Sequence, residues 1–324
     1  MPFRQPLDCE NDGPFSCFQG GRGIEREILR LIGDKGPLTG AELLDALGGK
    51  SLALWKACRT SQALQVRTVG RRYLRLDRMV EDYARLSPSI LREFMTYAVV
   101  GTLGQEEALE QRVQGLVAHT GRVSQSKMAL ARGLLEKIES SLAEQWPHQG
   151  RICFIIAGDI AYGMAHDVSR PERSLGKLVN GSDIDLIVVG DDAVPKEFLR
   201  ELDKAIHWEK YLALIMPHFR EEIDYVVKDM DRVREQLQFD TFKRKVACKI
   251  LGEGVFLGGS GSLFQELKSL LSRQGIVARL QEMEERAKSF RLRAEERLLG
   301  SDAHSLKKEE LHLFYTTEES EEFE

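Results

Sequence analysis

The sequence predicts an α+β protein in which helical segments flank a central region of strands. Before residue 48, and again over residues 263–298, apolar residues recur every three or four positions, which is the period of an amphipathic helix. Short apolar runs typical of buried strands begin after Arg151. A chain of 324 residues is long for one compact unit, so we expect two or three units.

Composition and charge exclude several classes of protein. A net charge of −5 is too small for this length to imply a polyanionic partner. The five cysteines are scattered, which argues against a zinc ribbon or a disulfide framework and fits a reducing compartment. No apolar run approaches the roughly 20 residues that span a bilayer, and the N-terminus lacks the apolar centre of a signal peptide. We therefore expect a cytoplasmic protein without membrane contact.

Residues 23–78, which follow a loose leader at 1–22, predict three short helices and a hairpin. Thr39 is placed to cap the second helix, and Ser51 is placed to cap the third. Residues 64–76 then alternate apolar and polar side chains on both sides of a glycine, which is typical of a hairpin.

Three helices followed by a basic hairpin resemble a winged helix-turn-helix. Residues 50–78 carry eight basic residues against one acid, and such domains meet nucleic acid through the third helix and the hairpin. The alternative is that the hairpin packs on another unit, with its arginines solvated or paired with acids. The residues predicted to bind nucleic acid are Lys56, Arg59, Arg67, Arg71 and Arg72.

Residues 79–124 are predicted to form a helical connector that carries no chemistry. Ser87 followed by Pro88 has the form of a helix start, a cap residue before a proline. Farther on, apolar residues in steps of three and four from Met128 to Trp146 predict one long helix with a buried stripe.

The most informative stretch is residues 181–189, where Asp183 and Asp185 open an apolar strand. Because side chains alternate on a strand, both carboxylates project from one face. Two like charges so placed favour a divalent cation, and Mg²⁺ often binds one or two carboxylates together with substrate phosphates. Asp224 opens a later apolar strand and would complete the cluster if the two strands are neighbours. The sequence therefore predicts that Asp183, Asp185 and Asp224 bind Mg²⁺ or Mn²⁺.

Such a cluster suits in-line transfer of a phosphoryl or nucleotidyl group. One metal ion can lower the pKa of the attacking hydroxyl, and a second can stabilise the leaving pyrophosphate. Asp224 could bind the metal that activates the hydroxyl, or it could accept the proton itself. Both roles stay open at this point.

These residues resemble the DNA polymerase beta-like nucleotidyltransferase superfamily over residues 125–255. Members carry a Gly-Ser turn after a first strand, an Asp-x-Asp pair on the second and a third acid later, which Gly158, the 183/185 pair and Asp224 match. The resemblance implies transfer of a nucleoside monophosphate from a nucleoside triphosphate to a hydroxyl of RNA, a protein or a small molecule. It also implies that the turn holds the triphosphate. The predicted nucleotide-binding residues are Gly158, Asp159, Ser182, Lys245 and Lys249.

Two features depart from the family pattern. Asp159 replaces the serine; it is placed to cap the next helix, but its charge opposes a phosphate there. The segment 158–183 is also longer than usual. Its basic residues either reach the phosphates or form a solvated loop, and the same alternatives hold for Lys245 and Lys249, one helical turn apart. The basic residues of the loop are Arg170, Arg173 and Lys177.

The remaining segments suggest support rather than chemistry. Residues 258–262 are glycine-rich but lack a phosphate-loop lysine, and we expect a flexible turn. Residues 256–312 predict a helical region that packs on the catalytic unit or supports a homo-oligomer, and residues 313–324 predict a solvated acidic tail. The alternative to an enzyme is a DNA-binding transcriptional regulator whose nucleotidyltransferase-like unit is a non-catalytic sensor or assembly module.

Overall fold

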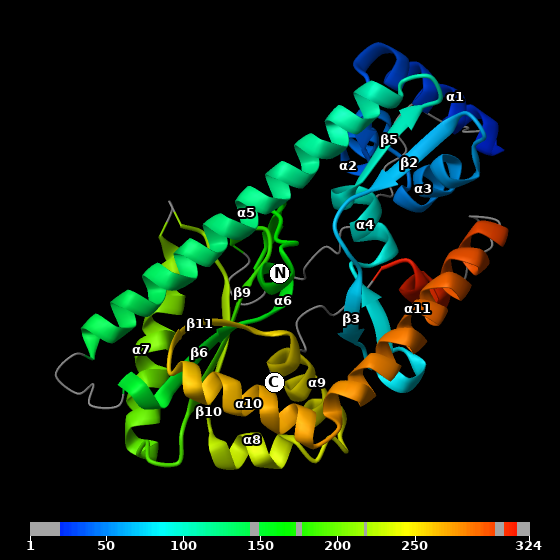
Figure 1. Ribbon diagram of the computed structural model, residues 1–324. Helices are drawn as coiled ribbons and strands as arrows, with labels where there is room; N and C mark the ends of the chain where they lie inside the picture. Colours follow the sequence, from blue (N-terminus) through cyan, green and yellow to red (C-terminus); the bar gives the residue numbers. More distant parts are fainter. Residues whose placement is uncertain (1–19, 143–148, 173–176, 217–218, 302–307, 316–324) are drawn as a thin grey trace.

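The computed structural model describes residues 20–142, 149–172, 177–216, 219–301 and 308–315 (Figure 1). The protein is α+β, as the sequence predicts, with small sheets set among helices. Two long helices, α5 (Glu106–Ser141) and α11 (Ile276–Gly300), run between a lobe built from the first part of the chain and a central four-stranded sheet (Figure 1).

The N-terminal lobe comprises residues 20–68 and 90–102. Its first three helices are those that the sequence predicts: α1 (Gly20–Lys35), α2 (Gly40–Leu47) and α3 (Ser51–Thr60). Thr39 caps α2 in a capping box with Glu42, as expected for this pair of residue types three positions apart. The cap predicted at Ser51 is wrong, because Lys50 occupies that position and no side chain caps α3.

The hairpin predicted over residues 64–76 does not form. Strand β2 (Leu64–Thr68) pairs with β5 (Ala98–Thr102) in a sheet of order β1-β5-β2, whose first member is β1 (Leu38–Thr39). Strand β3 (Tyr73–Leu76) pairs instead with β4 (Ala84–Ser87). Between them Gly70 turns the chain at a φ of 76°, and any side chain there would overlap Met164. Tertiary contacts of β3 therefore override the local hairpin pattern.

The helical connector predicted over residues 79–124 is wrong for its first part, although residues 106–124 are helical. This range holds a 3₁₀ turn (Glu81–Tyr83), β4, helix α4 (Ile90–Tyr97) and β5 before α5 begins. Helix α4 is capped by Ser89, which accepts from the Arg92 amide, whereas Ser87 ends β4. Strands of four or five residues are too short for their apolar spacing to be distinguished from that of a helix.

The apolar stripe of the long helix is confirmed. Ala131, Leu135 and Ile138 are buried against the central sheet on α5, and Met128 packs beside them. Trp146, the last residue of the predicted stripe, lies outside the described residues. Helix α5 passes through the boundary predicted at residues 124–125, so the units of the structure do not follow that division.

The central sheet has the strand order β10-β9-β6-β11. Strands β9 (Ile184–Gly190) and β10 (Ile223–Asp229) are parallel, and helix α7 (Lys196–Ile215) connects them. The other two strands, β6 (Ile152–Ile156) and β11 (Val255–Gly259), extend the sheet by antiparallel pairs. Helices α5 and α7 cover one face, and the helices that follow β10 cover the other (Figure 1). These are α8 (Met230–Gln236), α9 (Phe242–Glu253), α10 (Gly261–Arg273) and α11.

Three short elements connect β6 to β9: α6 (Gly158–Tyr162), β7 (Ser169–Pro171) and β8 (Leu178–Asn180). The flexible turn predicted over residues 258–262 is wrong, because the first two glycines end β11 and Ser260 caps α10 by accepting from the Leu263 amide. The helical hairpin predicted farther on is confirmed as α10 and α11, with Gly275 between them in the left-handed conformation at a φ of 67°.

Part of the predicted acidic tail is built into the N-terminal lobe. After a 3₁₀ turn (Lys308–Leu313), Phe314 is 1% exposed, and its ring lies 5.6 Å from that of Trp55, centroid to centroid. Residues 316–324 lie outside the described part of the chain. Among the helices that the structure describes, none combines the length and the apolarity needed to cross a membrane.

Candidate functional site

The central sheet brings the predicted acids together at one end of β9 and β10. The two strands are neighbours, as expected, and Asp224 lies directly opposite Asp185 in the parallel register. Asp183 lies directly before β9, two residues from Asp185. All three carboxylates are partly exposed, so solvent and ligands can reach them.

Two cationic side chains form ion pairs with the acids at this end of the sheet. Arg170 on β7 forms an ion pair with Asp183, and its guanidinium lies 2.8 Å from a carboxylate oxygen of Glu222. Lys210 on α7 donates to Asp224 at 3.0 Å. In the part of the chain that is described, no three Asp, Glu, His or Cys side chains are arranged to hold a metal ion. Carboxylate oxygens are nevertheless the ligands that Mg²⁺ prefers.

Gly158 fits the turn against Asp185 because it has no side chain. Its φ is 63°, and a Cβ atom at this position would overlap the Asp185 Oδ2 atom. The Ala157 amide donates to the Asp185 carbonyl oxygen at 3.0 Å, which fixes the end of β6 beside the start of β9. The turn at Gly158 therefore packs directly against the Asp185 carboxylate.

Asp159 does not cap the following helix, contrary to the sequence prediction. Helix α6 begins one residue earlier, and Ala157 occupies the cap position. The Asp159 carboxylate instead accepts from the Tyr73 hydroxyl, from Ser182 Oγ at 2.8 Å and from Arg92 at 3.2 Å. Strong partners from other parts of the chain compete successfully with the backbone amides of a one-turn helix.

These contacts keep Asp159 ionised. Burial by itself raises the pKa of this carboxyl, whereas the positive charges of Arg92 and then His166 lower it. Hydrogen bonds from Tyr73 and Ser182 lower it further, so the pKa falls to about 2. Asp159 therefore carries a negative charge beside the turn at neutral pH.

A second carboxylate accepts a hydrogen bond from a backbone amide of the turn. Glu253, at the end of α9, accepts from the Gly158 amide at 3.2 Å and from the Tyr162 hydroxyl at 2.7 Å. Lys249 is 5% exposed and lies 2.9 Å from Glu253, so the solvated helix face that we considered for it is wrong. Lys245 lies over the ring of Tyr83, with Nζ 5.2 Å from the centroid.

The long loop between the turn and the acids is folded where it is described. Arg170 also donates from Nε to the Gly181 carbonyl oxygen at 3.0 Å, so it is not part of a solvated loop. Lys177 is exposed, and Arg173 lies outside the described residues. Burial is the main cause that raises the pKa of Glu222, and Arg170 opposes it.

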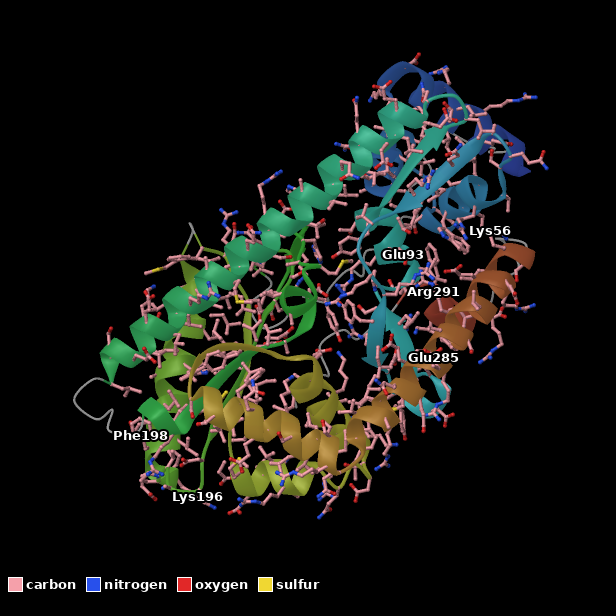
Figure 2. The ribbon with its side chains drawn as sticks, viewed as in Figure 1. Lys56, Glu93, Lys196, Phe198, Glu285 and Arg291 are labelled. Atoms are coloured by element: carbon pink, nitrogen blue, oxygen red, sulfur yellow. The ribbon has the colours of Figure 1, made fainter. Side chains whose placement is uncertain are left out.

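Three of the residues predicted to bind nucleic acid have partners within the protein. Lys56 donates to the Ser301 carbonyl oxygen at the end of α11, and Arg59 lies 3.9 Å from Glu295 (Figure 2). Arg72 donates two hydrogen bonds to the Glu93 carboxylate, of 2.6 Å and 2.7 Å. The alternative of arginines paired with acids therefore describes this face of α3 better.

The remaining two predicted residues stay at the surface. Arg67 is exposed on β2, and Arg71 is exposed with its guanidinium 4.6 Å from the centroid of the Tyr162 ring. Arg71 thus lies next to the turn that carries Gly158, which places part of the predicted nucleic-acid surface close to the acidic site.

Sequence reasoning missed several residues that shape this site. Tyr73, Arg92 and Lys210 reach it from β3, α4 and α7, and only the tertiary fold reveals such contacts. Lys228 carried a usable signal, because it lies four residues after Asp224 on the same apolar strand and therefore on the same face.

The site combines carboxylates with the two cations that pair with them, Arg170 and Lys210. Carboxylates are ligands for divalent cations, and lysine and arginine are ligands for phosphate oxygens. Comparisons with protein-family models, with curated proteins and with solved structures give no match to this chain.

Proposed function

We propose that the protein transfers a nucleoside monophosphate from a nucleoside triphosphate to an acceptor hydroxyl and releases pyrophosphate. Its site would hold Mg²⁺ or Mn²⁺ on Asp183, Asp185 and Asp224. The observation that carries the proposal is the parallel register that sets Asp224 beside Asp185, with Gly158 packed against the same carboxylate. Three acids on one sheet end are costly to keep together without cations.

The chemistry would divide among the residues in the following way. Mg²⁺ or Mn²⁺ bound at these acids would neutralise the triphosphate and lower the pKa of the attacking hydroxyl. Asp183 and Asp185 orient the metal ions, and Asp224 either binds the activating ion or accepts the proton of the hydroxyl. Arg170 and Lys210 neutralise the acids before substrate arrives and are available to the phosphates afterwards.

Label transfer tests this proposal. The protein is incubated with each nucleoside triphosphate labelled at the α-phosphate, with Mg²⁺ or Mn²⁺, and with total RNA or a cell extract. Asp183→Asn and Asp185→Asn remove the ligand charges without changing side-chain size, and we expect them to abolish transfer. Asp231→Asn, on the exposed side of α8, is the matched control and should retain full transfer.

The results of this assay have a clear reading. Transfer that survives both substitutions would exclude the acids as the catalytic site. Transfer that is absent with every base, metal and acceptor would exclude the enzyme and leave the second candidate. Circular dichroism of each variant shows that a loss of transfer is not a loss of folding.

The second candidate is a DNA-binding regulator in which this unit is a non-catalytic sensor or assembly module. The specific observation in its favour is that Asp159 and Glu253 place carboxylates on the turn that would otherwise receive a triphosphate. The three helices and the β1-β5-β2 sheet of the N-terminal lobe support a winged-helix interpretation. Tight duplex DNA binding without label transfer would select this candidate.

In either case, we propose that nucleic acid binds through Arg67 and Arg71 rather than through α3. Lys56 and Arg59 contact the C-terminal half of α11, through the Ser301 carbonyl oxygen and Glu295, whereas Arg67 and Arg71 are exposed and form no ion pair with the described residues. Phosphate contacts by arginine release counterions, so such binding weakens as salt rises. A salt series with the Arg67→Gln, Arg71→Gln double variant measures this, and a dependence on salt equal to that of the wild type would contradict it.

A further inference from the structure

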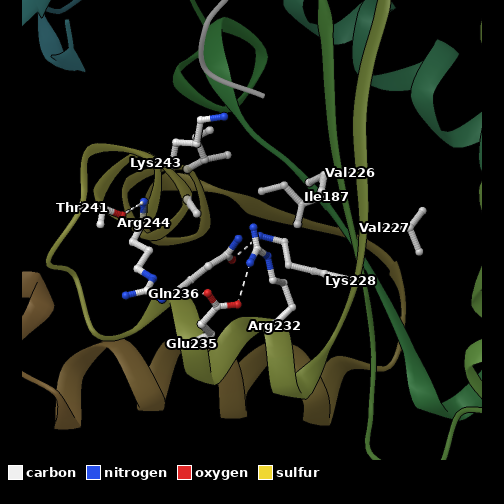
Figure 3. Close-up of a pocket in the computed structure, with 12 residues that line it drawn as sticks. Ile187, Val226, Val227, Lys228, Arg232, Glu235, Gln236, Thr241, Lys243 and Arg244 are labelled. Atoms are coloured by element: carbon white, nitrogen blue, oxygen red, sulfur yellow. Dashed lines mark hydrogen bonds and ion pairs between the residues drawn. The ribbon is translucent and has the colours of Figure 1, made fainter. Parts of the chain in front are cut away.

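A pocket opens beside the acids, between β10, α8 and α9 (Figure 3). Its volume is about 360 Å³. Ile187 and Val226 line it, and each lies two residues beyond an acid of the candidate site on the same strand face. With the rise of a strand, that spacing is about 6.5 Å. The pocket is therefore a neighbour of the acidic site on one face of the sheet.

Positive charge dominates the walls of this pocket. Four cations face a single carboxylate, that of Glu235. The same carboxylate is shared, since Arg232 donates to it at 2.6 Å and Arg244 at 2.7 Å. The cationic residues are Lys228, Arg232, Lys243 and Arg244.

Lys228 is the most unusual of these cations. Its side chain is 5% exposed, and its ammonium donates to the amide oxygen of Gln236 at 2.9 Å. Within the described residues this ammonium has no carboxylate partner. Figure 3 shows Arg232 extending toward it from α8, and the two charges repel. Burial, the largest cause, lowers the pKa of Lys228 to about 8.

A buried ammonium without an acid is costly, and an anion relieves that cost. Phosphate oxygens suit such a site, because they accept charge-assisted hydrogen bonds from lysine and arginine together. The apolar part of the wall suits the organic portion of the same ligand, and the volume falls within the usual range for small-molecule sites. This apolar wall consists of Ile187, Val226, Ala247 and Ile250.

We propose that this pocket binds a small phosphate monoester of mononucleotide size, with the phosphate on Lys228 and Arg232. The site is separate from the proposed catalytic acids, and its occupation requires no metal ion. The proposal therefore goes beyond the proposed function and stands whether or not the protein transfers nucleotides.

Calorimetric titration in the presence of a metal chelator tests the pocket, because the acids then cannot recruit a nucleotide through a metal ion. The probes are each common ribonucleoside 5′-monophosphate, the matching nucleosides and inorganic phosphate. We expect at least one monophosphate to bind and its nucleoside to bind far more weakly. Lys228→Met keeps the apolar stem and removes the charge, and it should weaken binding at least about tenfold.

Matched variants locate the binding site. Lys204→Met removes an exposed lysine of α7, and Asp185→Asn alters the acidic site; affinity for the monophosphate should stay within about twofold of the wild type in both. Arg232→Gln changes an exposed residue and should weaken binding several-fold, which keeps the test decisive if Lys228→Met does not fold.

Two results would overturn the proposal. One is a wild-type protein that binds no monophosphate at millimolar concentration. The other is a pair of folded variants, Lys228→Met and Arg232→Gln, that bind as tightly as the wild type. The melting temperature gives an independent readout, because the monophosphate should raise it in the wild type and leave it unchanged in Lys228→Met.

Discussion

Gly158 shows how a single missing side chain sets up the site. The backbone turns at positive φ, and the space that a Cβ atom would need is filled by the Asp185 carboxylate. Gly158 is thus required for two reasons: the positive φ, and the lack of space for a Cβ atom. Only the first reason applies to Gly163, since it has a φ of 69° and open space around it.

This pair of glycines yields a controlled prediction. Gly163→Ala should cost about 1 kcal/mol of unfolding free energy, which is the strain of a left-handed alanine. Gly158→Ala should cost at least about 1 kcal/mol more and should lower label transfer, because Asp185 must move. Urea unfolding and the transfer assay measure both variants. Equal losses in the two would show that Asp185 does not need its present position.

Asp159 makes a prediction about pH. Its pKa in the folded protein is about 2, below the ordinary value of 3.8. A carboxyl whose pKa is lowered by folding stabilises the protein above pH 4, and that contribution is lost as the pH falls toward 2. The contribution is roughly 2 kcal/mol at neutral pH.

Asp159→Asn should therefore be less stable than the wild type by about 2 kcal/mol at pH 7. The difference in stability should shrink steadily below pH 4, because the wild type then loses the stabilisation from the ionised Asp159 carboxylate, which the variant lacks at every pH. Urea unfolding across this pH range provides the measurement. A difference that stays constant down to pH 2 would mean that Asp159 is not the titrating group.

Helix α11 connects more parts of the protein than any sequence feature suggests. Its middle carries Arg291, which is 4% exposed and donates to the Pro88 carbonyl oxygen at 2.9 Å, to Glu93 at 2.9 Å and to Glu295 at 2.6 Å. The helix thereby joins α4 to the strands β3 and β4 (Figure 2). All three nitrogens of this buried guanidinium donate hydrogen bonds, so Arg291 holds the neighbouring elements together.

We expect Arg291→Ala to lower the free energy of unfolding by about 3 kcal/mol, because it removes a buried guanidinium that pairs with two largely buried carboxylates, those of Glu93 and Glu295. Arg72 also contacts Glu93 and limits the loss. Arg293→Ala, two residues along on the exposed side, should stay within roughly 0.5 kcal/mol of the wild type. Urea unfolding compares the two, and equal stability would contradict the role assigned to Arg291.

At the scale of single elements, sequence patterns predicted the features that depend on nearby residues but not those that depend on distant ones. The capping box of Thr39 and the apolar stripe of α5 depend on neighbours in the sequence, and both are confirmed. The hairpin over residues 64–76 failed because β2 finds its partner in β5, about thirty residues later. Pairing over that distance depends on tertiary packing, which the alternation of side chains does not record.

At the scale of the molecule, the sequence predicted the α+β class and the acidic cluster, but not its surroundings. Alternation on two apolar strands is enough to place Asp185 beside Asp224 once the strands are neighbours. The cations that engage the acids come from β7 and α7, and the partners of Asp159 lie 23, 67 and 86 residues away along the chain. Sequence spacing carries no information about such contacts.

The N-terminal lobe closes its core with residues that come much later in the chain than its first helices. Leu298 and Phe314 are buried among side chains of α1 and α3, including Ile28 and Trp55. During synthesis the first helices therefore leave the ribosome with apolar surface that nothing yet covers. Because chains with such exposed surface aggregate readily, we expect this lobe to be prone to aggregation until residues 298–314 have been synthesised.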